Sequence, residues 1–171
     1  MLKINGALLT LLLTILGCAP APQALAENGW QLSMVSASDN GVIEIGDKSR
    51  FEVVLKNIST EGKRFWKPTN SWGYYALYFD VQDSSGNVLK ISKKAISWRK
   101  NAPTYMEMPG GGSFVFKANL ADESWKMPEL MAGKYKIKAV ISVSADSKSK
   151  LLGVWTGKIE SKDYLVLVSH Y

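Results

Sequence analysis

Apolar and polar residues alternate with a period of two along most of the chain beyond residue 29. Residues 134–144 show this most clearly, because every odd position from Tyr135 to Val143 is apolar and a lysine precedes each of the first three. Such alternation is typical of strands that bury one face and expose the other. No segment of this region keeps a helical period over three turns, and residues 122–131 are expected to form a short helical turn at most. The pattern therefore predicts an all-β domain.

The apolar runs and the turn signals between them predict about eight strands. We expect these strands at residues 30–37, 41–45, 50–58, 73–82, 87–92, 113–119, 134–144 and 151–160. A last apolar run, Tyr164–Val168, is expected to continue the final strand past a bulge at residues 161–163. Turn-forming sequences such as Asp83-Ser84-Ser85-Gly86-Asn87 separate the strands. Many short strands with regular turns favour a β-sandwich.

One local motif sharpens this prediction. Leu130, Gly133 and Tyr135 have the L-x-x-G-x-Y spacing of a tyrosine corner. With the strand pattern, this motif resembles the immunoglobulin-like and fibronectin-like domains of bacterial secreted proteins or lipoproteins. The resemblance implies an immunoglobulin-like Greek-key β-sandwich of about 7–9 antiparallel strands. It also implies that the Tyr135 hydroxyl bonds to backbone a few residues upstream, and that the domain is an adhesive, inhibitory or spacer module.

The N-terminal segment has the features of a targeting signal. Lys3 supplies a positive charge, and residues 7–16 form an apolar run broken only by two threonines. This run is shorter than the ~20 residues that span a bilayer, and it fits the apolar region of a secretory signal peptide. We therefore expect a signal peptide at residues 1–26 and a single domain at residues 30–171.

Two processing sites are compatible with this signal. Ala24-Leu25-Ala26 is an A-x-A cleavage site that would make Glu27 the first mature residue. Alternatively, Ile15-Leu16-Gly17-Cys18 resembles a bacterial lipobox, which would place a lipid on Cys18 and make residues 19–29 a tether. The match departs from the lipobox pattern, where leucine is commoner than Ile15 and a small residue usually stands in place of Leu16. Either site predicts export to the periplasm, and membrane contact is expected only through a lipid on Cys18.

Composition excludes most catalytic chemistry. The chain has 171 residues, of which 46% are hydrophobic and 21% charged, as in one ordinary globular domain. It holds one histidine, His170, and one cysteine, Cys18. A terminal His170 is poorly positioned for catalysis, and the chain after residue 26 has neither a second histidine nor a cysteine for the usual nucleophile or zinc arrangements. We expect no enzyme, no catalytic residue, no metal and no cofactor.

Aromatic and basic residues gather in two segments between the predicted strands, residues 63–72 and 93–100. Strand connectivity places both segments at one end of a sandwich, together with the loop at residues 145–150. Tryptophan and arginine are favoured anchors at binding interfaces. The predicted binding residues are Arg64, Trp66, Lys67, Trp72, Trp98, Arg99 and Lys100. The other interpretation is that these tryptophans fold back and plug the open end of the sandwich.

The first functional hypothesis is a non-catalytic envelope module that engages a protein partner through this end, with an inhibitor or immunity protein as one version. The net charge of +6, or +5 once Lys3 is removed, also fits an anionic polysaccharide. The alternatives are therefore a module that binds anionic glycans and a structural or assembly component whose sheet edge accepts a partner strand. Export argues against nucleic acid as a partner.

Overall fold

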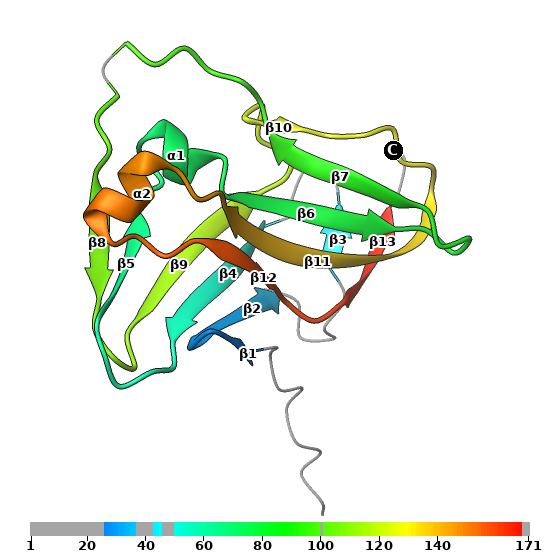
Figure 1. The fold of residues 1–171 in the computed structure, drawn as a ribbon. Coiled ribbons are helices and arrows are strands. Elements are labelled where there is room, and N and C mark those ends of the chain that lie inside the picture. The colour runs from blue at the N-terminus through cyan, green and yellow to red at the C-terminus, as the bar shows by residue number, and fades with distance from the viewer. Residues whose placement is uncertain (1–25, 37–42, 46–49, 100, 169–171) are drawn as a thin grey trace, which may run out of the picture.

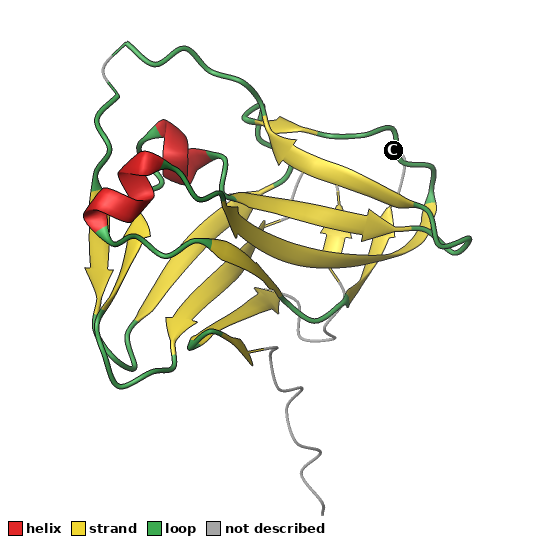
Figure 2. Ribbon diagram, viewed as in Figure 1, coloured by secondary structure: helices red, strands yellow, loops and turns green. Residues whose placement is uncertain are grey.

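The computed structural model describes residues 26–36, 43–45, 50–99 and 101–168 (Figure 1). The fold is all-β with two short helices, and its strands form two principal sheets that enclose the core (Figure 2). The first sheet has the strand order β1-β2-β4-β9 and is antiparallel throughout. Its strands are β1 (Ala26–Glu27), β2 (Trp30–Ser36), β4 (Arg50–Asn57) and β9 (Ser113–Asn119).

The second sheet has the order β10-β7-β6-β11-β13-β3, and β12 pairs with the other half of β11. All of its pairings are antiparallel except that of β13 with β3. Its strands are β3 (Ile43–Ile45), β6 (Leu77–Gln82), β7 (Val88–Lys93), β10 (Trp125–Lys126), β11 (Gly133–Val143), β12 (Gly157–Glu160) and β13 (Tyr164–Val168). The expectation of an all-β sandwich agrees with this arrangement.

The core lies between the two sheets and follows the predicted alternation. On β4, Phe51, Val53 and Leu55 are buried while Glu52 and Lys56 are exposed. Side chains from the facing sheet meet them, as when the ring of Phe51 contacts the ring of Phe79 edge to face at a centroid distance of 4.9 Å. Each fully buried side chain of this size stabilises the fold by about 1.5–3 kcal/mol.

The predicted bulge in the last strand is present. Val140 is paired with Glu160, but Ile137 is paired with Tyr164, so one extra residue is inserted between β12 and β13. At the bulge, the backbone N–H of Ala139 donates to the Ser161 hydroxyl at 2.9 Å. The hydroxyl thereby replaces the missing backbone partner of a buried N–H group.

The hydrogen bond expected of a tyrosine corner is also present. The Tyr135 hydroxyl donates to the carbonyl of Met131 at 3.0 Å, near the start of β11. Leu130 is buried, and Gly133 begins the strand. The motif therefore ties the entrance of the longest strand to the connection that precedes it.

Two predicted strands are too long because a helix occupies one end of each. The first is α1 (Ser71–Tyr74), whose N-cap Asn70 accepts from the N–H of Gly73, so the strand expected at residues 73–82 begins only at Leu77. The second is α2 (Ser147–Leu152), which lies in the stretch predicted as a loop at 146–150 and the start of a strand. Asp146 caps it in a reciprocal arrangement with Ser149. The helical turn expected within residues 122–131 is absent, and β10 is found there instead.

A further two-stranded ribbon, β5 (Lys63–Trp66) with β8 (Tyr105–Met108), was not predicted. It continues the β4–β9 pair beyond a break at the buried Asn57. The Asn57 amide donates to the carbonyls of Glu61 and Met108 at 2.7 and 3.0 Å, and its oxygen accepts from Ser59. One side chain thus satisfies the backbone groups that the break leaves unpaired.

Candidate binding site

The expectation that Trp66 is an exposed anchor is wrong. Its side chain is 1% exposed, and the preceding Phe65 is fully buried as well. Both are buried because β5 is covered on both faces. Phe65 packs against Trp30 and Phe116 in the core, whereas Trp66 packs against Trp72 of α1 at a ring distance of 5.7 Å. Trp66 therefore contributes to stability and offers no surface to a partner.

Trp72 is a structural tie between the two helices. Its indole N–H donates to Oδ2 of Asp146, the N-cap of α2, at 3.1 Å. The pKa of the Asp146 carboxyl lies below its usual value, mainly because it accepts from the backbone N–H of Ser149, and Trp72 adds to this effect. Trp72 and Asp146 thus hold α1 and α2 together.

Arg64 is engaged within the molecule. Its Nε donates to Oε1 of Glu107 at 2.9 Å, its Nη1 donates to the Leu152 carbonyl at 2.9 Å, and its guanidinium lies 4.6 Å from the centroid of the Tyr105 ring. Because these contacts join β5, β8 and the end of α2, Arg64 fixes the position of α2. A ligand would have to break them to use the guanidinium.

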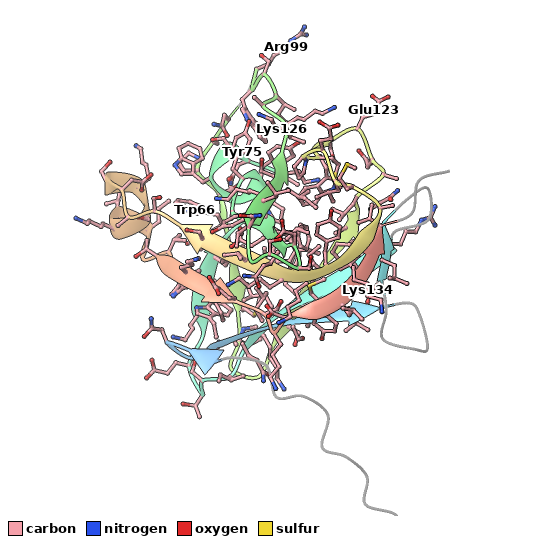
Figure 3. All side chains as sticks on the ribbon, turned by 90° about the vertical axis from the view of Figure 1, so that its right-hand side faces the viewer. Trp66, Tyr75, Arg99, Glu123, Lys126 and Lys134 are labelled. Atoms are coloured by element: carbon pink, nitrogen blue, oxygen red, sulfur yellow. The ribbon has the colours of Figure 1, made fainter. Side chains whose placement is uncertain are left out.

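The remaining predicted residues lie in different surroundings. Lys67 and Arg99 are exposed, and Figure 3 shows Arg99 at the tip of a loop that projects away from Trp66. Trp98 is half-buried, with its ring 5.6 Å from that of Tyr74. Lys100 lies outside the described residues, as do Cys18 and the signal peptide up to residue 25.

The three segments do converge at one end, as the strand connectivity predicted. Asn101 and Ser71 exchange hydrogen bonds of 2.6 and 3.1 Å, and Trp72 reaches Asp146. We call this region, made of β5, α1, α2 and residues 94–99 and 101–104, the tryptophan end. Its side chains contact one another, which agrees with the interpretation that the tryptophans plug the sandwich.

A groove that follows β9 is the better candidate. It has a volume of about 370 Å³ and is lined along one side by four consecutive β9 residues, Phe114–Lys117. Tyr74, Lys93 and Trp125 line it from α1, β7 and β10. We call it the β9 groove. Its volume is at the lower end of the range of ~300–1,000 Å³ found for ligand pockets.

Two larger hollows are weaker candidates. One, of about 890 Å³, is lined by Arg64 and Glu107, which are already paired with each other. The other, of about 600 Å³, lies beside Val35 and Arg50, next to residues outside the described part of the chain. The β9 groove combines several aromatic side chains, Tyr74, Phe114, Phe116 and Trp125, with the edge strand of a sheet.

The backbone of β9 has a free edge along this groove. The N–H of Asn57 donates to the Gly112 carbonyl at 2.9 Å, so these two residues form a hydrogen-bonded pair of the β4–β9 ladder. Hydrogen-bonded and non-hydrogen-bonded pairs alternate in an antiparallel ladder. The N–H and C=O groups of Val115 and Lys117 therefore point away from β4 and toward the groove. No described backbone group is hydrogen-bonded to them from that side.

The hydrogen bonds between β2 and β4 lead to the same conclusion. The N–H of Ile58 donates to the Gly29 carbonyl at 2.9 Å, so the even-numbered residues of β4 bond to β2. Val54, which is directly opposite Val115, thus uses its N–H and C=O toward β2. Val115 has no backbone partner on β4, and its backbone polar groups are open to an added strand.

Lys93 gives the groove a positive charge held between aromatic rings. Its Nζ lies 3.8 Å from the Trp125 ring centroid and 5.6 Å from that of Tyr74, and it donates to the Ser124 hydroxyl at 2.8 Å. Burial lowers the pKa of Lys93, and the nearby Asp122 carboxylate partly opposes this shift. Lysines but no carboxylates line the groove, so it suits a ligand that combines apolar surface with acidic groups.

Sequence reasoning missed most of this site. Lys93 and Tyr74 fall inside or beside the predicted aromatic and basic segments, whereas Trp125, which is buried, lies outside both of them. The β9 residues were identified only as a strand. Their exposed alternate positions, Val115 and Lys117, are visible in the sequence, whereas the edge position of the strand depends on sheet order.

Within the described ranges, no group of three His, Cys, Asp or Glu side chains comes together in a way that could hold a metal ion. Neither α1 nor α2 is long and apolar enough to cross a membrane, and no other described segment is a helix of that kind.

Comparisons with known proteins do not place the chain in a family. No protein-family model and no curated protein matches it. Among solved structures it is similar to the C-terminal domain of Wzt, with 12% identity and a TM-score of 0.44 over 90% of this chain and 81% of that chain. It is also similar to part of a β-glucosidase from Listeria innocua in complex with glucose, with 14% identity and a TM-score of 0.38 over 83% of this chain and 16% of that chain. Similarities this weak assign no function.

Proposed function

We propose that this protein is a non-catalytic binding module that takes an extended segment of a protein partner along β9. The observation that carries the proposal is that the β9 groove runs beside backbone N–H and C=O groups with no described partner. An extended peptide placed there would add a strand to the first sheet. Strand addition is a common mode of peptide recognition, in which main-chain hydrogen bonds supply affinity and flanking pockets supply specificity.

The groove supplies both contributions. The N–H and C=O groups of Val115 and Lys117 would pair with the peptide backbone, and alternate peptide side chains would face the rings of Tyr74 and Phe114. Lys93 and the Lys117 side chain would pair with acidic groups of the peptide. The partner segment is therefore expected to be extended, partly apolar and acidic.

The proposal includes an immunoglobulin-like Greek-key fold for the sandwich. The Tyr135 bond to Met131 at the start of β11, and the split of the last strand into β12 and β13 beside β11, support it. It also includes export to the periplasm, with a lipid on Cys18 or cleavage before Glu27. The mass of the N-terminal peptide from purified protein distinguishes these two forms.

A second candidate function is the binding of an acidic saccharide in the same groove. Aromatic rings pack against the C–H faces of sugars, and lysines pair with their carboxylates. The placement of Lys93 between the rings of Trp125 and Tyr74 favours this candidate, because it joins both kinds of contact at one point. It does not require the free edge of β9, and this difference separates the two candidates.

The test of strand addition is a substitution that removes one N–H group from the free edge. Val115→Pro leaves the β4–β9 ladder intact, because the N–H of residue 115 faces away from β4, a position where proline is tolerated on an edge strand. Val115→Thr is the matched control, since it keeps the N–H and a β-branched side chain. Peptides would be selected from a random display library on the wild-type protein, and synthetic versions would be titrated by calorimetry. We expect Val115→Pro to weaken binding at least tenfold and Val115→Thr to leave it unchanged.

Lys93→Met and Lys94→Met separate the acidic contact from general charge. Lys94 neighbours Lys93 but does not line the groove, so only Lys93→Met is expected to weaken peptide binding. An acidic oligosaccharide such as an oligogalacturonide serves as the competing probe. If the oligosaccharide binds, depends on Lys93 and is indifferent to Val115→Pro, the saccharide candidate replaces strand addition. If neither probe depends on Lys93 or Val115, the β9 groove is not the binding site.

A further inference from the structure

The outer face of the second sheet carries a concentration of lysines that the β9 groove does not use. On β11 the odd-numbered residues are turned into the core, so Lys134, Lys136 and Lys138 all face outward. Register places the side chains of neighbouring strands beside them on the same face. The strand lysines of this face are Lys90, Lys126, Lys134, Lys136, Lys138 and Lys158.

Among the side chains that the structure describes, carboxylates pair with only some of these lysines. Glu160 forms ion pairs with both Lys138 and Lys158, and its pKa lies below the usual value mainly because of the bond from Lys138. Asp80 lies in register between Lys90 and Lys138. Lys134 and Lys136, by contrast, form no ion pair with a described carboxylate.

Exposed apolar side chains flank the two unpaired lysines. Leu165 is paired with Lys136 and Leu167 with Lys134, and these leucines are 46% and 37% exposed. On the other side of Lys136, Gln82 of β6 leads to Val88 of β7, which is 58% exposed. Neighbouring strands are about 4.8 Å apart, so this row extends about 14 Å across four strands. We call Lys134, Lys136, Leu165, Leu167 and Val88 the lysine–leucine patch.

We propose that the lysine–leucine patch docks the domain on an anionic phospholipid bilayer. Lysine ammonium groups are attracted to the phosphates of such a surface, and exposed leucine and valine side chains enter the boundary between headgroups and acyl chains. A soluble polyanion would satisfy the lysines alone, since it offers nothing apolar to Leu165 and Leu167. The combination of cationic and apolar side chains on one face of the sheet therefore favours the bilayer.

This second surface is separate from the β9 groove. The groove lies between β9 of the first sheet and the β7–β10 end of the second, whereas Leu165 and Leu167 belong to β13, on the far side of β6 and β11 from β7. A domain docked through the patch would keep the groove free for a ligand. Membrane contact would then not depend on a lipid at Cys18 alone.

Vesicle co-sedimentation tests the proposal. The full chain would carry Cys18→Ser to prevent lipid attachment, and all variants would share this background so that the apolar run at residues 7–16 contributes equally. The probes are vesicles of phosphatidylcholine alone and of phosphatidylcholine mixed with phosphatidylglycerol. We expect binding to the mixed vesicles that weakens with salt, and at least a tenfold loss in Lys134→Glu/Lys136→Glu.

Two further variants make the result specific. Leu165→Ser/Leu167→Ser should also weaken binding severalfold, with single Leu167→Ser as the substitute if the pair does not fold. Lys56→Glu/Lys148→Glu makes the same change in charge at exposed lysines of β4 and α2, away from this face, and should bind almost as the parent does. The proposal is overturned if phosphatidylglycerol adds no binding, if the control pair loses as much as the patch pair, or if the leucine variant binds fully. The last result would indicate a soluble polyanion as the ligand.

Discussion

The tryptophan end and the β9 groove both contain aromatic rings and cations, yet only one of them is open to a ligand. At the tryptophan end, Trp66 packs on Trp72, and Arg64 is bonded to Glu107 and the end of α2. In the β9 groove, Lys93 lies beside the rings of Trp125 and Tyr74 at the wall of a cavity. The two regions contain the same residue types. Their side chains contact one another at the tryptophan end, whereas in the β9 groove they line a cavity.

The difference follows from the ends of the sheets. The β5–β8 ribbon buries Phe65 in the core on one face, and on its other face Trp66 is covered by Trp72 of α1. The edge of β9 is left uncovered, and its backbone groups remain without described partners. A cluster of tryptophans between strand signals is therefore better evidence of a plugged end than of a binding tip when a short ribbon occupies that end.

The largest expected effect comes from Trp66. Trp66→Ala removes a buried ring and should lower the free energy of unfolding by about 3–5 kcal/mol, measured by urea denaturation. Trp98→Ala is the comparison, because Trp98 is half-buried and its indole N–H has no hydrogen-bond partner among the described residues. Trp98→Ala should lower the free energy of unfolding clearly less than Trp66→Ala does. If Trp66→Ala is as stable as the wild type, Trp66 is not buried, and the tryptophan end is again a candidate binding surface.

The second largest effect tests how closely α1 is packed on β5. A Cβ atom at Gly73 would lie 2.2 Å from the Lys67 carbonyl oxygen, so backbone must move to accept it. Gly73→Ala is expected to lower the free energy of unfolding by about 1–3 kcal/mol through overpacking. At Gly62 the nearest atom to such a Cβ is 4.0 Å away, so Gly62→Ala is the matched control and should be nearly neutral. Similar losses in both variants would contradict the close approach of α1 to β5.

A third variant removes a single hydrogen bond at a position away from the β9 groove. Tyr135→Phe removes only the hydroxyl that donates to Met131. Loss of one such hydrogen bond should lower the free energy of unfolding by about 0.5–1.5 kcal/mol while peptide binding at the β9 groove is unchanged. A change in peptide binding with no change in stability would contradict the structural role of this bond.

The smallest expected effect is a dependence of stability on pH, to which a carboxyl near each of the two regions contributes. Backbone N–H groups of Ser149 and Ser124 lower the pKa values of Asp146 and Asp122 respectively. A carboxyl with a lowered folded-state pKa contributes stability above its unfolded-state pKa and loses it as pH falls through the folded-state value. The thermal midpoint should therefore fall as the pH is lowered below about 4. Asp146→Asn and Asp122→Asn, which keep an acceptor oxygen, should each make this fall shallower; an unchanged slope in both would exclude these carboxyls as its source.

The sequence predicts repeated structure well and local exceptions poorly. The period of two locates β4, β9 and β11 within one residue at each end, and even the bulge at Ser161 is visible as an interruption of an apolar run. Helix α1 is missed because it has only one turn and its cap, Asn70, has the composition of a loop. Ribbon β5–β8 is missed because Asn57 breaks the strand pattern while its side chain keeps the chain paired.

The candidate site was harder to predict for a related reason. Sequence position indicates which segments reach one end of the sandwich, and that convergence is found. It does not indicate whether a ring such as Trp66 turns inward, because inward and outward packing use the same residue types. The importance of Val115 depends on which strand lies at the edge of the sheet, and that order is a property of the whole fold.

Amide hydrogen exchange, resolved by residue, tests the central claim most directly. The domain would be compared with and without a peptide selected on it, at a concentration that saturates binding. If the peptide adds a strand to β9, the amides of Val115 and Lys117 should exchange at least tenfold more slowly, while those of β5 and α2 remain unchanged. Slower exchange at Trp98 or along α2, with Val115 unaffected, would contradict the account and place the binding surface at the tryptophan end.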